Sequence, residues 1–378
     1  MATLTFLTHT VFDHDASQQL HQVLAQHGIR RPLLCTDRGL VGLGMVNDLT
    51  AHVGNDAVLT VYDGTPENPT QAAVEEATAK YREADCDGVL AFGGGSSIDL
   101  AKAVALSVTH KGDLLEFTAG LGGVGKIGPV APLVAIPTTA GTGSEVSNGA
   151  VIIMNNGEKL ILASPNLVPR TAICDPTLTI GLPPHLTAAT GMDAITHCVE
   201  ALLSPMENPP AEAVACDGID RGVKEGHLLR AVRDGSDRDA RWNMMMAATE
   251  GAMAFSKGLG AVHAMSHACG ADQELRLHHG TLNAVILPTI LDFNREHVGQ
   301  KYARLNAAMG LATDADPAAH IRKLNAQLSL PANLAEMGVK PDALPALSAH
   351  AAKDVCTFTN PRPASEQDYL TLFETALL

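Results

Sequence analysis

Two pairs of polar residues in the second half of the sequence have the spacing of one helical turn. Asp193 and His197 are four residues apart, and so are His263 and His267. Residues i and i+4 lie on one face of a helix. One carboxylate and three imidazoles form a nitrogen and oxygen donor set that suits a divalent transition metal.

A third stretch places His278 and His279 directly before Gly280, where a further helix is expected to begin. Each pair has an ordinary alternative, such as an Asp–His hydrogen bond along one helix. Their occurrence together in one alanine-rich region favours a common metal site. We expect that site to leave a position open for a substrate oxygen, as catalytic sites do. A cation there would act as a Lewis acid on a hydroxyl group.

A glycine-rich loop in the first half has the features of a phosphate-binding site. Residues 88–92 are predicted to form a strand, Gly93-Gly94-Gly95 follow, and a helix is predicted over 96–108. Backbone N–H groups at a helix start bind anions, and glycines let the ligand approach closely. The loop is not a G-x-G-x-x-G fingerprint, because Ile98 stands at the third position, and it is not a P-loop. A plain tight turn is the alternative interpretation.

Asp37 follows a predicted strand over 32–36. A carboxylate there accepts hydrogen bonds from an adenosine ribose and repels a 2′-phosphate, which would select NAD over NADP. The alternative is a capping Asp before Gly39. A second polar, glycine-rich loop over 137–144 follows the predicted strand 134–136. It is either a lining for the nucleotide or a long turn.

These candidates depend on elements that alternate through the first half of the chain. Strands are predicted over 4–7, 32–36, 57–62, 88–92 and 134–136, and helices over 16–27, 70–84 and 96–108. Ser96 and Asp99 have the spacing of a capping box at the start of the last helix. Alternating strands and helices are typical of a parallel sheet covered by helices.

Beyond residue 183 the pattern becomes helical. Helices are predicted over 186–203, 210–233, 238–254, 259–269 and 282–296. The length of 378 residues favours two domains. We expect residues 1–183 to form an α/β dinucleotide-binding domain and residues 184–378 to form a helical metal- and substrate-binding domain.

The composition argues against several classes of protein. The net charge is −15 and no run of Lys or Arg exceeds two residues, so nucleic-acid binding is not expected. We find no stretch apolar enough to span a membrane and no signal-peptide pattern at the N-terminus. The seven cysteines have no C-x-x-C spacing, which indicates reduced thiols. A cytoplasmic protein is expected.

Five motifs resemble those of the iron-containing, or group III, alcohol dehydrogenases, and they occur in the order typical of that family over nearly the whole chain. They are Gly93-Gly-Gly-Ser-Ser-Ile-Asp-Leu-Ala-Lys102, Ile136-Pro-Thr-Thr-Ala-Gly-Thr-Gly-Ser-Glu-Val146, Gly191-Met-Asp-Ala-Ile-Thr-His197, Gly258-Leu-Gly-Ala-Val-His-Ala-Met-Ser-His267 and Asn360-Pro-Arg362. The resemblance implies a Rossmann-like α/β N-terminal domain, an all-α C-terminal domain as in dehydroquinate synthase, and a cleft that holds NAD(P) and a metal.

The resemblance also implies roles for individual residues. Asp193, His197 and His263 would be metal ligands, and His279 would be the fourth. His267 would lie near the nicotinamide and relay protons. The residues expected to contact the cofactor are Asp37, Gly94, Gly95, Ser96, Asp99, Thr138, Thr139, Thr142, Ser144, Val146 and Lys159.

The segment between His267 and His279 departs from the family pattern, because it is longer and lacks the proline that usually follows the second histidine. His278 therefore remains an alternative to His279 as the fourth ligand. The segment also contains Arg276. We hypothesise that Arg276 pairs with the carboxylate of a short hydroxy-acid substrate, and the alternative is an ordinary surface arginine.

We therefore expect a metal-dependent, NAD-linked alcohol dehydrogenase or aldehyde reductase that transfers hydride between nicotinamide and a primary alcohol or short hydroxy acid. NADP is the less expected cofactor. Fe²⁺ is the expected metal, and Zn²⁺ is an alternative because nitrogen and oxygen ligands accept both. The alternative functions are a maleylacetate reductase-like enzyme and a metal-dependent lyase of the dehydroquinate synthase type. A homodimer or a higher homo-oligomer is expected.

Overall fold

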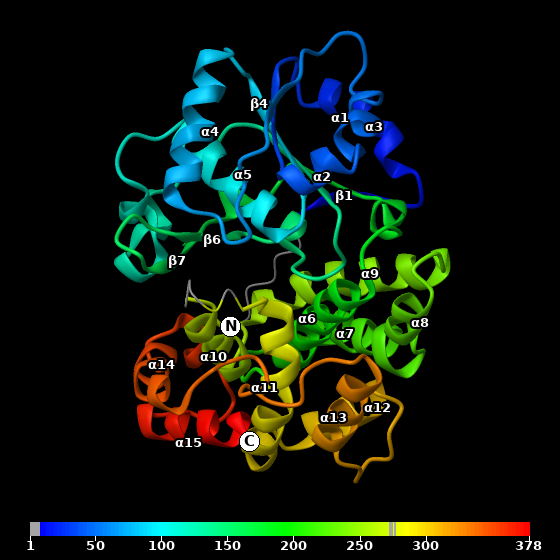
Figure 1. The fold of residues 1–378 in the computed structure, drawn as a ribbon, viewed down its shortest axis with the longest axis vertical. Helices are drawn as coiled ribbons and strands as arrows, with labels where there is room; N and C mark the ends of the chain where they lie inside the picture. The colour runs from blue at the N-terminus through cyan, green and yellow to red at the C-terminus, as the bar shows by residue number, and fades with distance from the viewer. Residues whose placement is uncertain (1–7, 272–274, 276) are drawn as a thin grey trace. The chain divides into compact units, whose positions relative to one another are not determined.

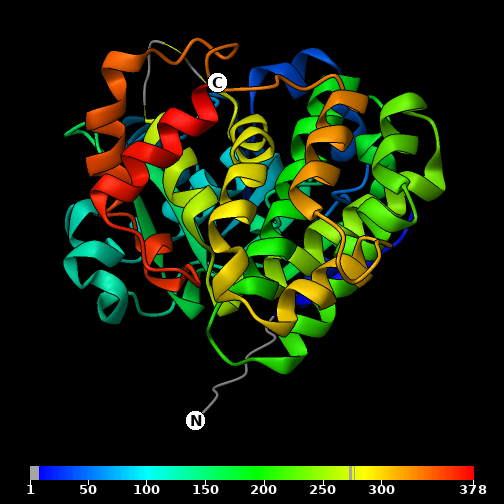
Figure 2. The ribbon, with the colours of Figure 1, turned by 90° about the horizontal axis from the view of Figure 1, so that it is seen from below.

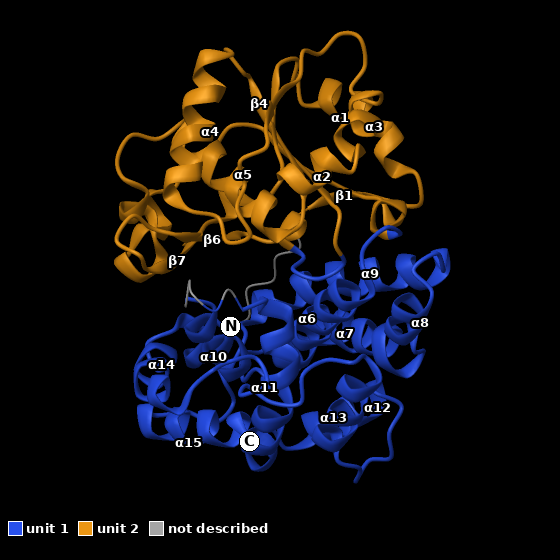
Figure 3. Ribbon diagram, viewed as in Figure 1, with its two compact units in different colours: residues 1–5, 140–143, 180–378 blue, residues 6–139, 144–179 orange. Residues whose placement is uncertain are grey.

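The computed structural model describes residues 8–271, 275 and 277–378. The chain divides into two compact units, which Figure 3 shows in two colours. The sheet unit comprises the described residues up to 139 together with 144–179, and the helical unit comprises the described residues of 140–143 and 180–378. The division at 179/180 lies close to residue 183, where the sequence changes to a helical pattern.

The sheet unit contains a six-stranded sheet in which every described pair of neighbouring strands is parallel. The strands in spatial order are β1 (His9–Phe12), β8 (Thr171–Cys174), β5 (Leu133–Pro137), β4 (Gly88–Gly93), β2 (Pro32–Cys35) and β3 (Thr60–Tyr62). From β2 the chain adds β3 on one side, and it then adds β4 and β5 on the other side, so the strand order reverses between β2 and β4. In parallel α/β sheets, ligands bind outside the carboxyl ends of the strands at such a reversal.

Helices cover both faces of this sheet, so its four inner strands, β8, β5, β4 and β2, are buried throughout. On β4, Val89 and Ala91 belong to a core with α4 (Gln71–Glu83) and α5 (Gly95–Ser107). The intervening Leu90 and Phe92 belong to a second core with α1 (Leu20–Gln26) and α3 (Met45–Thr50). Figure 1 shows these helices against the sheet. This burial explains why the inner strands are mainly apolar runs in the sequence.

Several assignments made from the sequence differ from the structure here. The strand predicted over 4–7 lies outside the described residues, and β1 was not predicted. Strand β8 and the antiparallel pair β6 (Gly149–Ile153) and β7 (Lys159–Ala163) were not predicted either. Their sequences offered only short apolar stretches without clear alternation.

The capping box expected at Ser96 and Asp99 is wrong. Helix α5 begins at Gly95, and its N-cap residue Gly94 has no side chain with which to cap. The Asp99 carboxylate is used elsewhere, because it accepts hydrogen bonds from Ser144 Oγ at 2.6 Å and from the backbone N–H of Val151 at 2.9 Å.

The helical unit is built around α6 (Pro184–Leu203), which packs against α7 (Pro209–Ile219), α8 (His227–Arg233), α9 (Arg238–Ala254) and α11 (His279–Asn294). Further helices are α10 (Ala261–Gly270), α12 (Gln300–Ala308), α13 (Pro317–Gln327), α14 (Leu344–Ala351) and α15 (Glu366–Leu377). Helices α14 and α15 lie side by side at the red end of the colour range in Figure 2. Among the described residues, no helix combines the length and the apolar character that a membrane span requires.

The single helix predicted over 210–233 is wrong. Helix α7 ends at Ile219, a π-helical turn covers Asp220–Lys224, and Gly226 adopts φ 73° before α8 begins. A left-handed glycine commonly ends a helix because it has no Cβ to clash. The expected fold class is confirmed, since the N-terminal part is a helix-covered parallel sheet and the C-terminal part is helical.

Candidate metal centre and cofactor loops

Four donor side chains from three helices face one another in the helical unit. Asp193 and His197 lie on α6, His263 lies on α10, and His279 is the first residue of α11. Asp193 Oδ1 lies 3.7 Å from His197 Nε2, 3.9 Å from His263 Nε2 and 3.6 Å from His279 Nε2. Ligand atoms of Asp193, His197 and His263 all lie within 4.8 Å of one another. These three side chains are buried, and His279 is partly exposed.

The spacing of these atoms suits a tetrahedral metal ion. Metal bonds of about 2.1 Å at tetrahedral angles separate two ligand atoms by about 3.4 Å. The three distances from the Asp193 carboxylate exceed that value by only a few tenths of an ångström. One carboxylate and three imidazoles are a donor set that Fe²⁺ and Zn²⁺ both accept. The side chains therefore fit a divalent cation.

The structure separates the two candidates for the fourth donor. The His279 ring lies 5.3 Å from that of His263, whereas His278 is exposed and its Nδ1 lies 3.4 Å from Thr281 Oγ1. Gly280 allows α11 to begin close to α6, since a Cβ there would lie 2.2 Å from the backbone oxygen of Ala189. His279, and not His278, is the residue brought to the cluster.

The carboxylate of Glu200, further along α6, orients His263. Its Oε2 accepts a hydrogen bond from His263 Nδ1 at 2.6 Å, and its Oε1 accepts one from the backbone N–H of Val262 at 2.7 Å. A proton on Nδ1 leaves the Nε2 lone pair free for a metal. Burial disfavours the charged imidazole, but the hydrogen bond to Glu200 and the charges of Glu200, Asp193 and Asp354 together raise the pKa of His263.

Burial dominates at His197 and lowers the pKa of this imidazole to about 4, against the attraction of Asp193. A neutral imidazole is the form that binds a metal. The His197 ring stacks on the His263 ring with a centroid distance of 4.7 Å. Gly251 on α9 leaves room for this arrangement, because a Cβ there would lie 3.0 Å from His197 Cβ.

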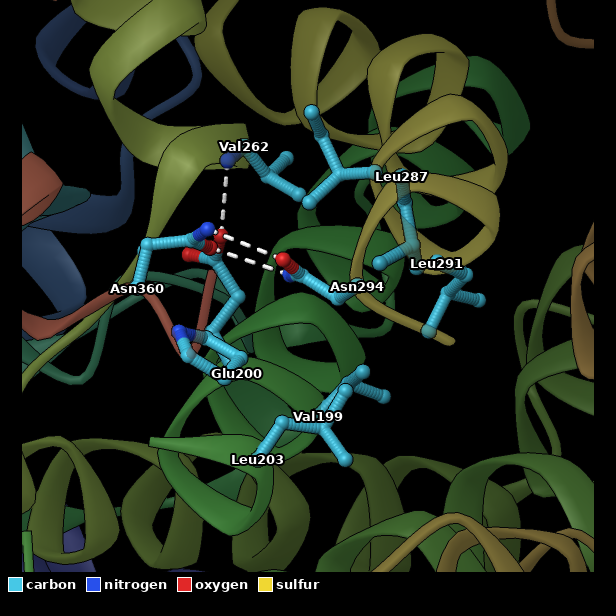
Figure 4. A pocket seen from close by; sticks show the side chains of 11 residues that line it. Val199, Glu200, Leu203, Val262, Leu287, Leu291, Asn294 and Asn360 are labelled. Carbon is cyan, nitrogen blue, oxygen red and sulfur yellow. Dashed lines mark hydrogen bonds between the residues drawn. The ribbon is translucent and has the colours of Figure 1, made fainter. Parts of the chain in front are cut away.

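The Asn-Pro-Arg motif near the C-terminus holds α10 to α11. Asn360 Oδ1 accepts hydrogen bonds from the backbone N–H of Ala261, at the start of α10, and from Asn294 Nδ2, at the end of α11. Asn294 Oδ1 accepts a bond from Asn360 Nδ2 in return. Figure 4 shows this amide pair beside Glu200, where both asparagines line a small pocket. The motif is therefore structural, since it fixes the helix that carries His263.

His267 lies one turn after His263 and faces the same cluster. Its ring stacks on that of His279 with a centroid distance of 5.5 Å, and its Nδ1 donates to Asp354 Oδ2 at 2.9 Å. Burial opposes ionisation of Asp354, but its interactions with His267 lower the pKa of the Asp354 carboxyl to about 2. Asp354 was not identified from the sequence. Arg276 lies outside the described residues, and its role stays a prediction.

The expected cofactor-binding residues follow three neighbouring strands of the sheet unit. Asp37 follows β2, Gly94 follows β4 and Thr138 follows β5, and these strands end where the strand order reverses. The Asp37 carboxylate accepts a hydrogen bond from the backbone N–H of Leu40 at 3.0 Å and caps α2 (Arg38–Gly42). The capping interpretation is therefore confirmed, and a role of Asp37 toward a ribose stays a prediction.

Several of the other residues expected to contact the cofactor form hydrogen bonds within the sheet unit. Ser96 Oγ donates to the carbonyl oxygen of Glu67, and Lys159 Nζ donates to Asn68 Oδ1 at 2.9 Å. Gly95 is the first residue of α5, and Val146 ends the 3₁₀ turn Ser144–Val146. Thr138 is buried and Thr139 is partly buried, whereas Thr142 belongs to the helical unit.

Lys102, at the end of the first family-like motif, is fully buried on α5 and anchors the loop that contains Ser144. Its Nζ donates to Ser144 Oγ at 3.0 Å, to Ser147 O at 2.9 Å and to Gly149 O at 2.6 Å. Burial lowers the pKa of Lys102 to about 8, against the attraction of Asp99. Hydrogen bonds to a buried cation are costly to remove, so Lys102 holds residues 144–149 in one place.

Comparisons with known proteins agree with this architecture. The family description "Iron-containing alcohol dehydrogenase" matches residues 8–176, and "Fe-containing alcohol dehydrogenase family, C-terminal" matches residues 187–377. The chain is 49% identical to the 4-hydroxybutyrate dehydrogenase of Cupriavidus necator, with 100% of both chains covered. It is 36% identical to the 1,3-propanediol dehydrogenase of Citrobacter freundii over 92% of each chain. A crystal structure of 1,3-propanediol oxidoreductase superimposes with a TM-score of 0.93, 33% identity and 100% coverage of both chains.

These similarities cover both units and the motifs that carry the donor cluster and the glycine loop. They favour a dehydrogenase over both alternatives expected from the sequence, the maleylacetate reductase-like enzyme and the lyase. The chain is therefore an oxidoreductase that acts on alcohols, and it belongs to the iron-containing alcohol dehydrogenase family.

Proposed function

We propose that this enzyme is an NAD-linked, iron-dependent dehydrogenase of 4-hydroxybutyrate or of a closely related short ω-hydroxy acid. The observation that carries the substrate class is the 49% identity to a 4-hydroxybutyrate dehydrogenase over the full length of both chains. Metal dependence is supported by the buried cluster of Asp193, His197, His263 and His279. We propose in addition that the enzyme is cytoplasmic and works as a homo-oligomer.

In the proposed reaction the terminal hydroxyl becomes an aldehyde. NAD, when held by the sheet unit, would accept the hydride from the carbinol carbon, and the hydroxyl proton would leave. Asp193, His197, His263 and His279 would hold a divalent cation, which would supply Lewis acidity to the hydroxyl oxygen. His267 is the proposed proton acceptor, because its Nδ1–H donates to Asp354 and this leaves the Nε2 lone pair free.

The sheet unit is proposed to hold NAD. Backbone N–H groups at the start of α5, next to Gly94 and Gly95, suit the pyrophosphate. Asp37 is proposed to accept hydrogen bonds from the ribose while it caps α2, since a carboxylate has two oxygens. The same negative charge would disfavour the 2′-phosphate of NADP.

Steady-state kinetics with Fe²⁺-loaded and Zn²⁺-loaded enzyme tests the substrate class. The matched pair is 4-hydroxybutyrate and n-butanol, which has the same carbon chain without the carboxylate. A hydrogen-bonded ion pair to the carboxylate corresponds to a preference of about tenfold to a hundredfold in kcat/KM for the hydroxy acid. An equal or greater kcat/KM for n-butanol would overturn the proposed substrate class, and a preference for NADP⁺ would overturn the role of Asp37.

Arg276 is the proposed partner of the substrate carboxylate. Arg276→Ala should reduce the preference for 4-hydroxybutyrate and leave the kcat/KM for n-butanol unchanged. The control is Arg322→Ala, because Arg322 is a half-exposed arginine on α13 that pairs with Asp292. If the preference survives in Arg276→Ala, the residue is an ordinary surface arginine.

A further inference from the structure

Asn283, one turn after His279 on α11, extends into the donor cluster. Its side chain is fully buried, and its Nδ2 donates to Asp193 Oδ1 at 2.7 Å. The same nitrogen lies 3.2 Å from His263 Nε2 and 3.2 Å from His279 Nε2. One amide nitrogen thus contacts three of the four atoms that we assign to the metal.

The hydrogen bonds around the two histidines are consistent with an amide donor at this place. His263 carries its proton on Nδ1, which donates to Glu200. His279 Nδ1 lies 3.4 Å from Ser266 Oγ, and this hydroxyl donates to the backbone oxygen of His263 at 3.2 Å. With both protons on Nδ1, each Nε2 atom offers a lone pair, so the Asp193 carboxylate and the two imidazoles share the two amide hydrogens of Asn283.

The other end of the amide has no such partners. Asn283 Oδ1 is buried and has no hydrogen-bond partner among the described residues. An unpaired buried acceptor costs free energy. The three acceptors around Nδ2 therefore determine how the Asn283 amide is oriented. Those three acceptors are also the atoms whose lone pairs a cation needs.

We propose that Asn283 is a placeholder for the metal ion. In the metal-free chain the Asp193 carboxylate and the two imidazoles share its two amide hydrogens, and the contacts to the imidazoles are released when the ion binds. The release is obligatory, because one nitrogen lone pair does not accept a hydrogen bond and bind a metal at the same time. This inference rests on the metal site proposed above.

The placeholder role predicts the effect of removing the amide. Without it, the metal-free chain retains a buried carboxylate and two imidazole lone pairs that have lost their donor. In the loaded chain the ion satisfies the same atoms, so the loss matters less there. Linkage then requires the metal to bind more tightly to the variant. Since one hydrogen bond is worth roughly fivefold in an equilibrium constant and the contacts to two imidazoles are released, we expect about tenfold tighter binding.

The experiment measures Zn²⁺ affinity by competition with a chromogenic chelator, together with the melting temperatures of metal-free and Zn²⁺-loaded protein. Asn283→Ala should bind Zn²⁺ about tenfold more tightly, and its metal-free form should lose more melting temperature than its loaded form. Asn283→Ser retains a small hydrogen-bond donor and should lie between the wild type and Asn283→Ala. If Asn283→Ala fails to fold, the Zn²⁺ affinity of Asn283→Ser still tests the placeholder role.

Asn306→Leu is the matched control. Asn306 is also fully buried, donates two hydrogen bonds to backbone oxygens at 3.0 Å, and has an Oδ1 without a partner among the described residues. Its replacement should lower both melting temperatures equally and leave the Zn²⁺ affinity unchanged. Unchanged or weaker Zn²⁺ binding by both Asn283 variants would overturn the placeholder role. A wild-type chain that binds no Zn²⁺ and no Fe²⁺ would instead overturn the metal site itself.

Discussion

Replacement of Glu200 by glutamine tests how the protein prepares His263 for a metal. Glu200 is buried and uses both carboxylate oxygens, one for His263 Nδ1 at 2.6 Å and one for the backbone N–H of Val262 at 2.7 Å. Glutamine has one acceptor oxygen and one donor group. If the oxygen keeps the bond to Val262, the NH₂ group faces His263 Nδ1, and two donors then oppose each other.

The imidazole relieves that conflict by moving its proton to Nε2. This tautomer places a hydrogen where the metal needs a lone pair, so metal binding must reverse it. The lost bond is charge-assisted and is worth about 1.5–3 kcal/mol, which corresponds to about tenfold to a hundredfold in metal affinity. Replacement of groups that orient metal-bound histidines typically has an effect of this size. We therefore expect the Zn²⁺ dissociation constant of Glu200→Gln to rise by about that factor.

The assay is chelator competition with Zn²⁺, with the melting temperature of the metal-free protein measured alongside. Glu212→Gln is the control, because Glu212 is a largely buried carboxylate of the same unit that pairs with Lys257, Lys301 and Arg304. It should lower stability and leave the Zn²⁺ affinity intact. A Zn²⁺ dissociation constant of Glu200→Gln within threefold of the wild type would show that Glu200 does not prepare His263 for a metal.

Three further predictions concern other parts of the chain. Gly280→Ala should weaken Zn²⁺ binding and lower the melting temperature, because its Cβ would lie 2.2 Å from a backbone oxygen of α6. Lys102→Met should raise the KM for NAD⁺ by about tenfold through release of residues 144–149, with an unchanged metal content checked by elemental analysis. Burial and the nearby Asp217 raise the pKa of Glu250 to about 9. Between its ordinary pKa and pH 9, this carboxyl therefore stays protonated in the folded chain and ionises in the unfolded chain. Its contribution to stability is therefore full below the ordinary pKa and falls as the pH rises toward 9. The melting temperature of Glu250→Gln relative to wild type should accordingly increase between pH 5 and pH 9, and a constant difference would contradict the assignment.

The sequence predicts the parts of the site that follow helical periodicity. Asp193 and His197 lie one turn apart on α6, and His263 and His267 lie one turn apart on α10, so their spacing alone placed each pair on one face. The glycine loop was equally predictable, because β4 is buried on both faces and appears as an apolar run before the glycines. These features depend on local order along the chain.

The partners that complete the site depend on tertiary packing. Asp354 reaches His267 from 87 residues away, and Asn283 meets Asp193 from 90 residues away, and neither pairing leaves a local pattern. The choice between His278 and His279 was open for the same reason, because it depends on how α11 approaches α6. The break at Gly226 was missed because the apolar spacing continues on both sides of it. Such features follow from three-dimensional contacts that periodicity does not encode.

The most direct test of the metal site is a crystal structure of the metal-loaded chain, with anomalous scattering used to locate the ion. We expect one anomalous peak about 2.0–2.2 Å from ligand atoms of Asp193, His197, His263 and His279. A peak bonded to His278, or a peak at the separate group formed by His267, Asp354 and Cys356, would contradict it.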